Sequence, residues 1–80
     1  MKYIPILTFI SDTDAAFQIH IIDKNLEKEV GIGSIILKKE SETFNTVQCE
    51  YYVPEQYNVS KKEIEAECLK TLIAMKKVVV

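Results

Sequence analysis

The sequence predicts an α+β domain in which a four-stranded antiparallel β-meander is followed by one C-terminal helix packed on one face of the sheet (ββββα). Four segments rich in β-branched and aromatic residues, separated by short polar turns, occupy residues 2–53 of the 80-residue chain. One helical pattern follows at residues 58–77. Short turns between consecutive strands favour antiparallel neighbours, so we expect a single domain over residues 1–80.

The four strands are predicted over residues 2–10, 17–23, 30–39 and 44–53. Pro5 favours an edge position for the first strand, because proline cannot donate to a sheet ladder. The segment SDTD between the first two strands is typical of a turn, since Ser and Asp side chains bond nearby backbone. In the third strand, VGIGSIILKK, the glycines favour a bulge or a close backbone approach.

The helix is predicted to begin at Ser60, an N-cap, with Glu63 three residues later completing a capping box. Its apolar residues recur at spacings of three and four and form one stripe. The stripe consists of Ile64, Cys68, Leu72, Met75 and Val79, widened by Leu69 and Ile73. A helix of about eighteen residues is roughly 27 Å long, so it covers only one face of a four-stranded sheet.

The strands nevertheless carry large apolar residues on both faces. Alternation in the first strand places Tyr3, Leu7 and Phe9 on one side, and Ile4, Ile6 and Ile10 on the other. Either the sheet curls on itself or a second chain covers the remaining face, because large uncovered apolar patches are uncommon on monomers. We therefore expect a homodimer or a protein partner. The candidate interface residues are Tyr3, Leu7, Phe9 and His20.

Composition argues against several function classes. Ten Lys against twelve acidic residues give a net charge of −2, and the chain contains no Arg, so no overall basic field attracts nucleic acid. With one His and no CxxC, no metal site or cofactor is predicted. Cys49 and Cys68 are interpreted as buried reduced thiols.

No catalytic residue is predicted either. Turn formation accounts for Asp12, Asp14 and Asp23 at the strand ends, and His20 has no candidate nucleophile beside it. The N-terminal apolar run is too short for a signal peptide, and no apolar run approaches the roughly eighteen residues of a membrane span. We expect a cytoplasmic protein with no membrane association that is not an enzyme.

The segments IHIID, GIGSIIL and EAECLKTLIAMKK, within residues 17–77, resemble ribonuclease H-like domains attached to retroelement reverse transcriptases. The resemblance implies that Asp23 and Glu67 correspond to the first two metal-binding acids of that family. The third acid of the family follows a further strand, beyond the point where this sequence stops at Val80. A two-metal site needs the full set of acids, so the resemblance implies a truncated, non-catalytic version.

The opening MKYIPILTFISDTDAAFQIHI is similar to the beginning of small antitoxins of the HicB type, which use a partial ribonuclease H-like fold to neutralise a partner. Their PDLPG segment is absent here. This similarity favours a small non-enzymatic modulator, antitoxin-like or an inhibitor from a phage or mobile element. Such a protein acts through a sheet face or an edge strand and is expected to form a homodimer.

The alternative is a nucleic-acid-binding module. SKKE at residues 60–63 is similar to the helix start of double-stranded-RNA-binding domains, where paired lysines contact phosphates. Four strands followed by a helix are also similar to Whirly-type single-stranded-DNA-binding proteins. The candidate binding residues of this alternative are Lys38, Lys39, Lys61 and Lys62, with an aromatic group from Tyr51, Tyr52 or Tyr57.

Overall fold

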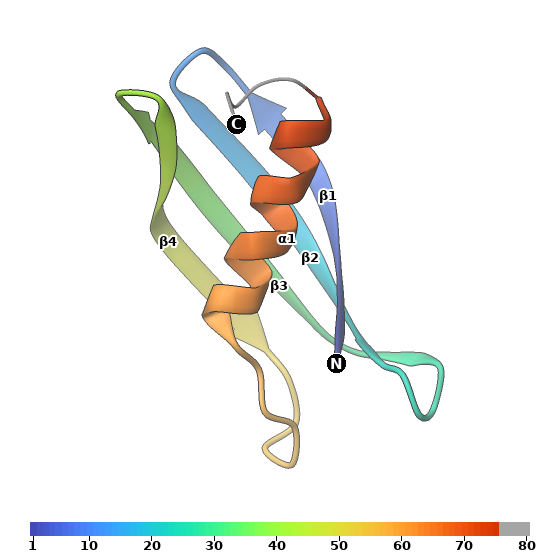
Figure 1. The fold of residues 1–80 in the computed structure, drawn as a ribbon. Helices are drawn as coiled ribbons and strands as arrows, with labels where there is room; N and C mark the ends of the chain where they lie inside the picture. The colour runs from blue at the N-terminus through green and yellow to red at the C-terminus, as the bar shows by residue number, and fades with distance from the viewer. Residues whose placement is uncertain (76–80) are drawn as a thin grey trace.

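The computed structural model describes residues 1–75, which form a four-stranded sheet and one helix (Figure 1). In chain order the elements are β1 (Lys2–Ile10), β2 (Asp14–Asp23), β3 (Lys28–Glu40), β4 (Thr43–Tyr52) and α1 (Lys61–Ala74). The strands lie in the order β1-β2-β3-β4, and each neighbouring pair is antiparallel. The predicted ββββα layout is thus confirmed, and β1 with its Pro5 is an edge strand.

Two strands are longer than their patterns indicated. β2 begins at Asp14, three residues before the predicted start, because Ala15 and Ala16 pair with Leu37 and Ile36 of β3. β3 likewise extends back to Lys28, which pairs with Asp23. Alanine and charged residues have weak strand preferences, so pairing with a neighbouring strand decides their conformation.

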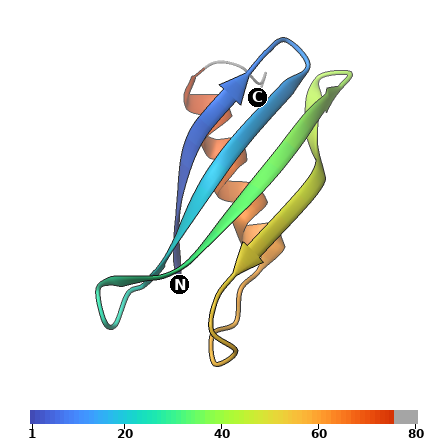
Figure 2. The ribbon, with the colours of Figure 1, turned by 180° about the vertical axis from the view of Figure 1, so that it is seen from behind.

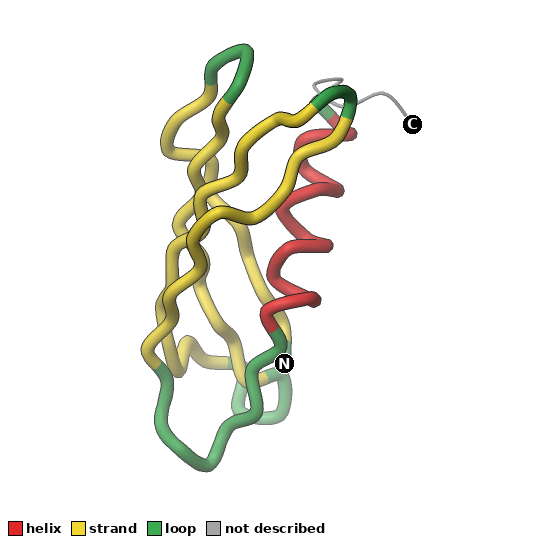
Figure 3. Tube along the Cα trace, turned by 90° about the vertical axis from the view of Figure 1, so that its left-hand side faces the viewer, coloured by secondary structure: helices red, strands yellow, loops and turns green. Residues whose placement is uncertain are grey.

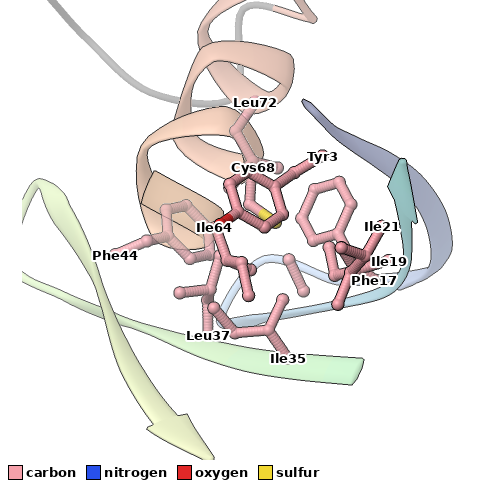
Figure 4. Packing of buried hydrophobic residues seen from close by; sticks show 11 residues of the cluster. Tyr3, Phe17, Ile19, Ile21, Ile35, Leu37, Phe44, Ile64, Cys68 and Leu72 are labelled. Carbon is pink, nitrogen blue, oxygen red and sulfur yellow. The ribbon is translucent and has the colours of Figure 1, made fainter. Parts of the chain in front are cut away.

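The core lies between α1 and one face of the sheet. Figure 1 shows α1 lying across this face, and Figure 3, which views the molecule edge-on, shows the two layers. The side chains that meet between the layers are drawn in Figure 4. They are Tyr3, Ala15, Phe17, Ile19, Ile21, Ile35, Leu37, Phe44, Ile64, Cys68 and Leu72, and each is at most 6% exposed.

The helix begins as predicted at Ser60, whose hydroxyl accepts a hydrogen bond from the backbone N–H of Glu63 at 3.3 Å. The reciprocal half of a capping box is replaced by a tertiary contact, since the Ser60 N–H donates to the Tyr3 hydroxyl at 3.2 Å. Three residues of the predicted stripe are buried, whereas Ile73 and Met75 are about two-fifths exposed. The stripe is therefore narrower than predicted, and its predicted member Val79 lies outside the described residues.

A β-bulge in β1 changes which residues face the helix. The register shifts between Leu7 and Phe9, so Phe9 pairs with Ala16 and Ile10 pairs with the buried Ala15. The grouping of Phe9 with Tyr3 and Leu7 was therefore wrong. Simple alternation fails here because the extra residue of a bulge reverses the direction of the side chains that follow.

Both options that the pattern left open for the two glycines of β3 occur. The β2–β3 register shifts beside Gly31, between Ile21 and Ile22, and β4 approaches both glycines closely. A Cβ atom on Gly33 would lie 2.7 Å from the carbonyl oxygen of Glu50, and one on Gly31 would lie 2.6 Å from that of Tyr52. Both distances are shorter than a van der Waals contact. Only glycine at these positions lets β4 lie so close to β3.

Candidate functional site: the open face of the sheet

The face of the sheet that points away from α1 is called the open face, and its side chains form three rows across the strands. The register aligns one residue from each strand in every row. The first row is Ile4, His20, Ile32 and Tyr52; the middle row is Ile6, Gln18, Ser34 and Glu50; the third row is Phe9, Ala16, Ile36 and Gln48. Two rows rich in apolar side chains therefore lie on either side of a more polar row.

The open face is apolar and uncovered. Its five largest aliphatic and aromatic side chains on β1 and β3 are 37–55% exposed, whereas the large apolar side chains facing α1 on the same strands are buried or partly buried against the core. These five residues are Ile4, Ile6, Phe9, Ile32 and Ile36. No segment within residues 1–75 lies over this face, as the view from behind in Figure 2 shows.

The charged residues of the open face lie mainly at the two ends of the sheet and on the β4 edge. His20 and Glu29 contact each other through Nδ1 and Oε1, so the imidazole has a partner within the chain. Glu50 accepts a hydrogen bond from the Gln48 amide at 3.2 Å, and Lys38 pairs in register with Asp14 at one end of the sheet. The centre of the face therefore presents neutral amide and hydroxyl groups among apolar side chains.

Both edges of the sheet are poorly suited to pairing with a further strand. β1 contains Pro5, which lacks an N–H, and the bulge after Leu7. β4 contains a second bulge, which leaves Val47 without a partner on β3. Prolines and bulges on edge strands are features that oppose edge-to-edge association. The open face is consequently the better contact surface of the two that the sequence suggested.

The predicted interface residues divide between the two faces. Phe9 and His20 lie on the open face. Tyr3 is buried and Leu7 packs against the core, so neither reaches the open face and their assignment to it was wrong. The cause is the choice of face on which α1 packs, because the helix covers the side of β1 that contains Tyr3.

The predicted nucleic-acid-binding lysines lie in two separate places. Lys38 and Lys39 precede the β3–β4 turn, at the upper end of the sheet in Figure 1. Lys61 and Lys62 begin α1 in the lower half of that view, after the chain has run the length of β4. All four side chains are exposed.

The three candidate tyrosines are also dispersed. Tyr51 faces the helix side and packs against the core, whereas Tyr52 projects from the open face with 70% exposure. Tyr57 is half-buried in the loop before α1, where its hydroxyl group interacts with Asp23. The structure therefore does not bring the seven candidate residues together on one surface.

The two acids singled out by the ribonuclease H resemblance have separate partners. The Asp23 carboxylate accepts backbone hydrogen bonds from Asn25 at 2.8 Å and Leu26 at 3.2 Å, the turn role expected of it. Glu67 pairs with Lys70 at 3.1 Å one turn along α1. Among residues 1–75, no group of three or more His, Cys, Asp or Glu side chains is arranged to hold a metal ion.

The interaction of the Tyr57 hydroxyl with the Asp23 carboxylate makes the loop before α1 sensitive to pH. It lowers the pKa of Asp23 below 3.8 and raises the pKa of Tyr57 above 10.0. The interaction therefore stabilises the folded state fully between pH 3.8 and pH 10.0. It is lost as pH falls through the lowered pKa of Asp23, and again as pH rises through the raised pKa of Tyr57.

We expect Tyr57→Phe to lower the urea midpoint at pH 7, and the difference from the wild type to shrink as pH falls well below 3.8. Urea titrations followed by circular dichroism at several pH values measure this. Tyr52→Phe is the matched control, because Tyr52 is exposed and should show no such difference. A difference for Tyr57→Phe that is constant with pH would show that the interaction does not stabilise the fold.

The two thiols face the helix side and are poorly reactive. Burial raises the pKa of Cys68 to about 12 and also raises the pKa of the half-buried Cys49. Because the thiolate is the nucleophile and metal ligand, both groups are protonated near neutral pH. Neither sulfur atom forms a disulfide, as predicted, but only Cys68 is fully buried, whereas Cys49 is partly buried.

A cleft lies beside the start of α1. This cleft of about 390 Å³ is open to solvent and contains side chains of both charges. Its lining residues are Met1, Lys2, Tyr3, Lys24, Glu63, Ala66 and Glu67. Because its lysines and glutamates balance each other, the cleft favours neither an anion nor a cation.

Comparisons of the chain with protein-family models, curated proteins and solved structures returned no match. Among the described residues, no helix has the length and apolar character needed to cross a membrane.

Most of the apolar open-face residues were not named as candidates from the sequence. Alternation indicates that Ile4 and Ile6 share a face, and that Ile32 and Ile36 share one. The missing information was which face α1 covers. That choice depends on contacts such as the one between Tyr3 and Ser60, which are 57 residues apart.

Proposed function

We propose that this chain is a small, non-enzymatic binding protein that contacts another protein through the open face. The observation that supports this most directly is the set of five exposed apolar side chains on one face of a sheet whose other face packs the core against α1. Contiguous apolar patches of this kind mark interaction sites in soluble proteins. The blunted edges of β1 and β4 favour the face over an edge strand.

A protein partner fits this face better than a nucleic acid does. Centres of protein interfaces are depleted in charge and enriched in apolar and aromatic side chains. Nucleic-acid binding depends instead on cations that neutralise phosphates. Of the four candidate lysines, only Lys38 lies on the open face, and it is opposite Asp14 in the register.

The biological role that we propose is inhibition or modulation, as in the antitoxins that the opening of the sequence resembles. A protein of this kind acts by occupying a surface of its partner and needs no chemistry of its own. The acids Asp23 and Glu67 are engaged with other groups, which supports a non-catalytic role.

A matched pair of variants tests the proposal. Ile6→Lys with Ile32→Lys changes the open face at two half-exposed positions, and Lys61→Glu with Lys62→Glu changes the start of α1. We expect the tagged wild type and the variant with Lys61→Glu and Lys62→Glu to recover the same protein from cells of the source organism. That protein is either a second copy of this chain or a different chain. The open-face variant should lose it while its circular dichroism spectrum stays that of a folded protein.

The same proteins should be applied to RNA and single-stranded DNA at about 50 mM salt, where non-specific contacts are still strong. We expect no retention. Retention that falls steeply with salt and disappears in the Lys61 and Lys62 variant would instead support the nucleic-acid alternative. A protein partner recovered equally well by the open-face variant would rule out the open face as its binding site.

A further inference from the structure

The pattern of the open face suits packing against a copy of itself. In a two-fold dimer each patch must be complementary to itself, and residues on the axis meet their own copies. The centre of the middle row consists of Gln18 and Ser34, on the two central strands. Amide and hydroxyl groups both donate and accept hydrogen bonds, so each of these residues can bond its own copy.

Two directions of the two-fold axis place the open face on itself. An axis parallel to the strands, between β2 and β3, lays β1 over β4 of the partner. Ile6 then meets the partner's Glu50, and Phe9 meets the partner's Gln48, because these residues occupy the same rows. Both contacts place an apolar side chain of β1 against a polar group of the partner, which is an unfavourable match.

An axis that runs across the strands, along the middle row, exchanges the first and third rows. Each strand then lies over its own copy. Ile4 meets the partner's Phe9, and Ile32 meets the partner's Ile36, so the most apolar parts of the face are opposite each other. This direction of the axis therefore matches apolar with apolar groups.

The same axis pairs large with small side chains on β2. His20 of the first row meets the partner's Ala16 of the third row. The imidazole Nδ1 keeps its contact with Glu29 of the same chain, so the ring enters the interface with a polar partner of its own. Close packing between two sheets requires this kind of fit.

We propose that the partner on the open face is a second copy of this chain, related by a two-fold axis that lies between the two sheets and runs along the middle row. This inference rests on the proposed function, since it names the occupant of the same surface. The two sheets then form a sandwich with α1 of each copy on the outside. Aligned sheets in such sandwiches cross at about −30°.

The size of the face predicts a reversible dimer. With strands about 4.8 Å apart and a rise of about 3.3 Å per residue, the face measures on the order of 500 Å². Two copies bury about 1,000 Å² together, which is near the lower limit for a specific interface. Glu50 meets its own copy at the β4 edge, so Glu50→Gln should tighten the dimer about two- to fivefold by removing like charges.

Sedimentation velocity over micromolar to millimolar concentrations tests whether the dimer forms. We expect the wild type to shift from monomer to dimer, Ile32→Lys to remain a monomer, and the control Lys62→Glu to behave as the wild type. Strictly monomeric wild type would overturn the proposal. The wild type could be a monomer and still recover a different protein from cells, with Ile32→Lys abolishing that recovery. The proposed function would then stand without a dimer.

Disulfide trapping tests the direction of the axis. We expect differently tagged Ile32→Cys and Ile36→Cys copies, when mixed and mildly oxidised, to form the mixed disulfide in excess over either homodimer. Inter-sheet disulfides of this kind occur in natural sandwiches. The wild type is the background control, because Cys49 and Cys68 face the helix side. Homodimer disulfides of Ile32→Cys that equal or exceed the mixed product would overturn this axis.

Discussion

Replacing Phe17 with alanine is expected to lower the free energy of unfolding by about 3–5 kcal/mol, the usual cost of deleting a buried aromatic side chain. Phe17 lies on a central strand between Leu7 and Ile35 and is only 1% exposed. A domain of this length has a total stability of about 4–12 kcal/mol. The expected loss is therefore a large part of the total, and it equals the whole stability at the lower end of this range.

Urea denaturation followed by circular dichroism measures this loss. Val47→Ala is a suitable control, because Val47 sits at the β4 bulge with 57% exposure and should change the free energy of unfolding by no more than about 0.5 kcal/mol. A loss below about 1 kcal/mol for Phe17→Ala would contradict the burial of this side chain in the core.

Replacing Gly33 with alanine is expected to destabilise the fold by about 1–3 kcal/mol, as overpacking does in other proteins. The new Cβ atom would lie 2.7 Å from the Glu50 carbonyl oxygen and 3.0 Å from the Tyr51 Cβ atom. One of these atoms belongs to the backbone, so relief requires β4 to move away from β3. A decrease in the free energy of unfolding would be informative, because alanine normally stabilises a strand relative to glycine.

Urea denaturation gives the overall loss, and hydrogen exchange should show faster exchange of the β4 amides in Gly33→Ala. Ser34→Ala is the matched control on the adjacent residue, since its side chain lies on the open face and is exposed. If Gly33→Ala were as stable as Ser34→Ala, the close approach of β3 and β4 would not depend on glycine.

Local patterns in the sequence predict most of the fold. The N-cap at Ser60 and the edge position of the strand that contains Pro5 follow from single residues with specific backbone chemistry. Alternation likewise identifies Phe17, Ile19 and Ile21 as one face, and all three are buried. These features depend on neighbours close in sequence, so one sequence is enough to predict them.

The candidate site was harder to predict, because it depends on contacts between distant residues. The direction of Phe9 is set by a bulge whose cause lies in the pairing of β1 with β2. The exposure of Ile32 is set by the choice of face on which α1 packs. Neither the bulge nor the choice of face can be recognised from residues close in sequence. The sequence pattern therefore predicted that one face of the sheet is uncovered, but not which residues form it.

The hydrogen bond between the Ser60 N–H and the Tyr3 hydroxyl joins the start of α1 to β1, so it forms only after all four strands have left the ribosome. Each hairpin of the meander joins segments adjacent in sequence, so the strands can pair as they emerge. The helix that covers Phe17 and Ile19 follows the four strands in the chain, so it is synthesised after them. Until then the nascent sheet exposes both apolar faces, and aggregation of unfinished chains is the characteristic hazard of this element order.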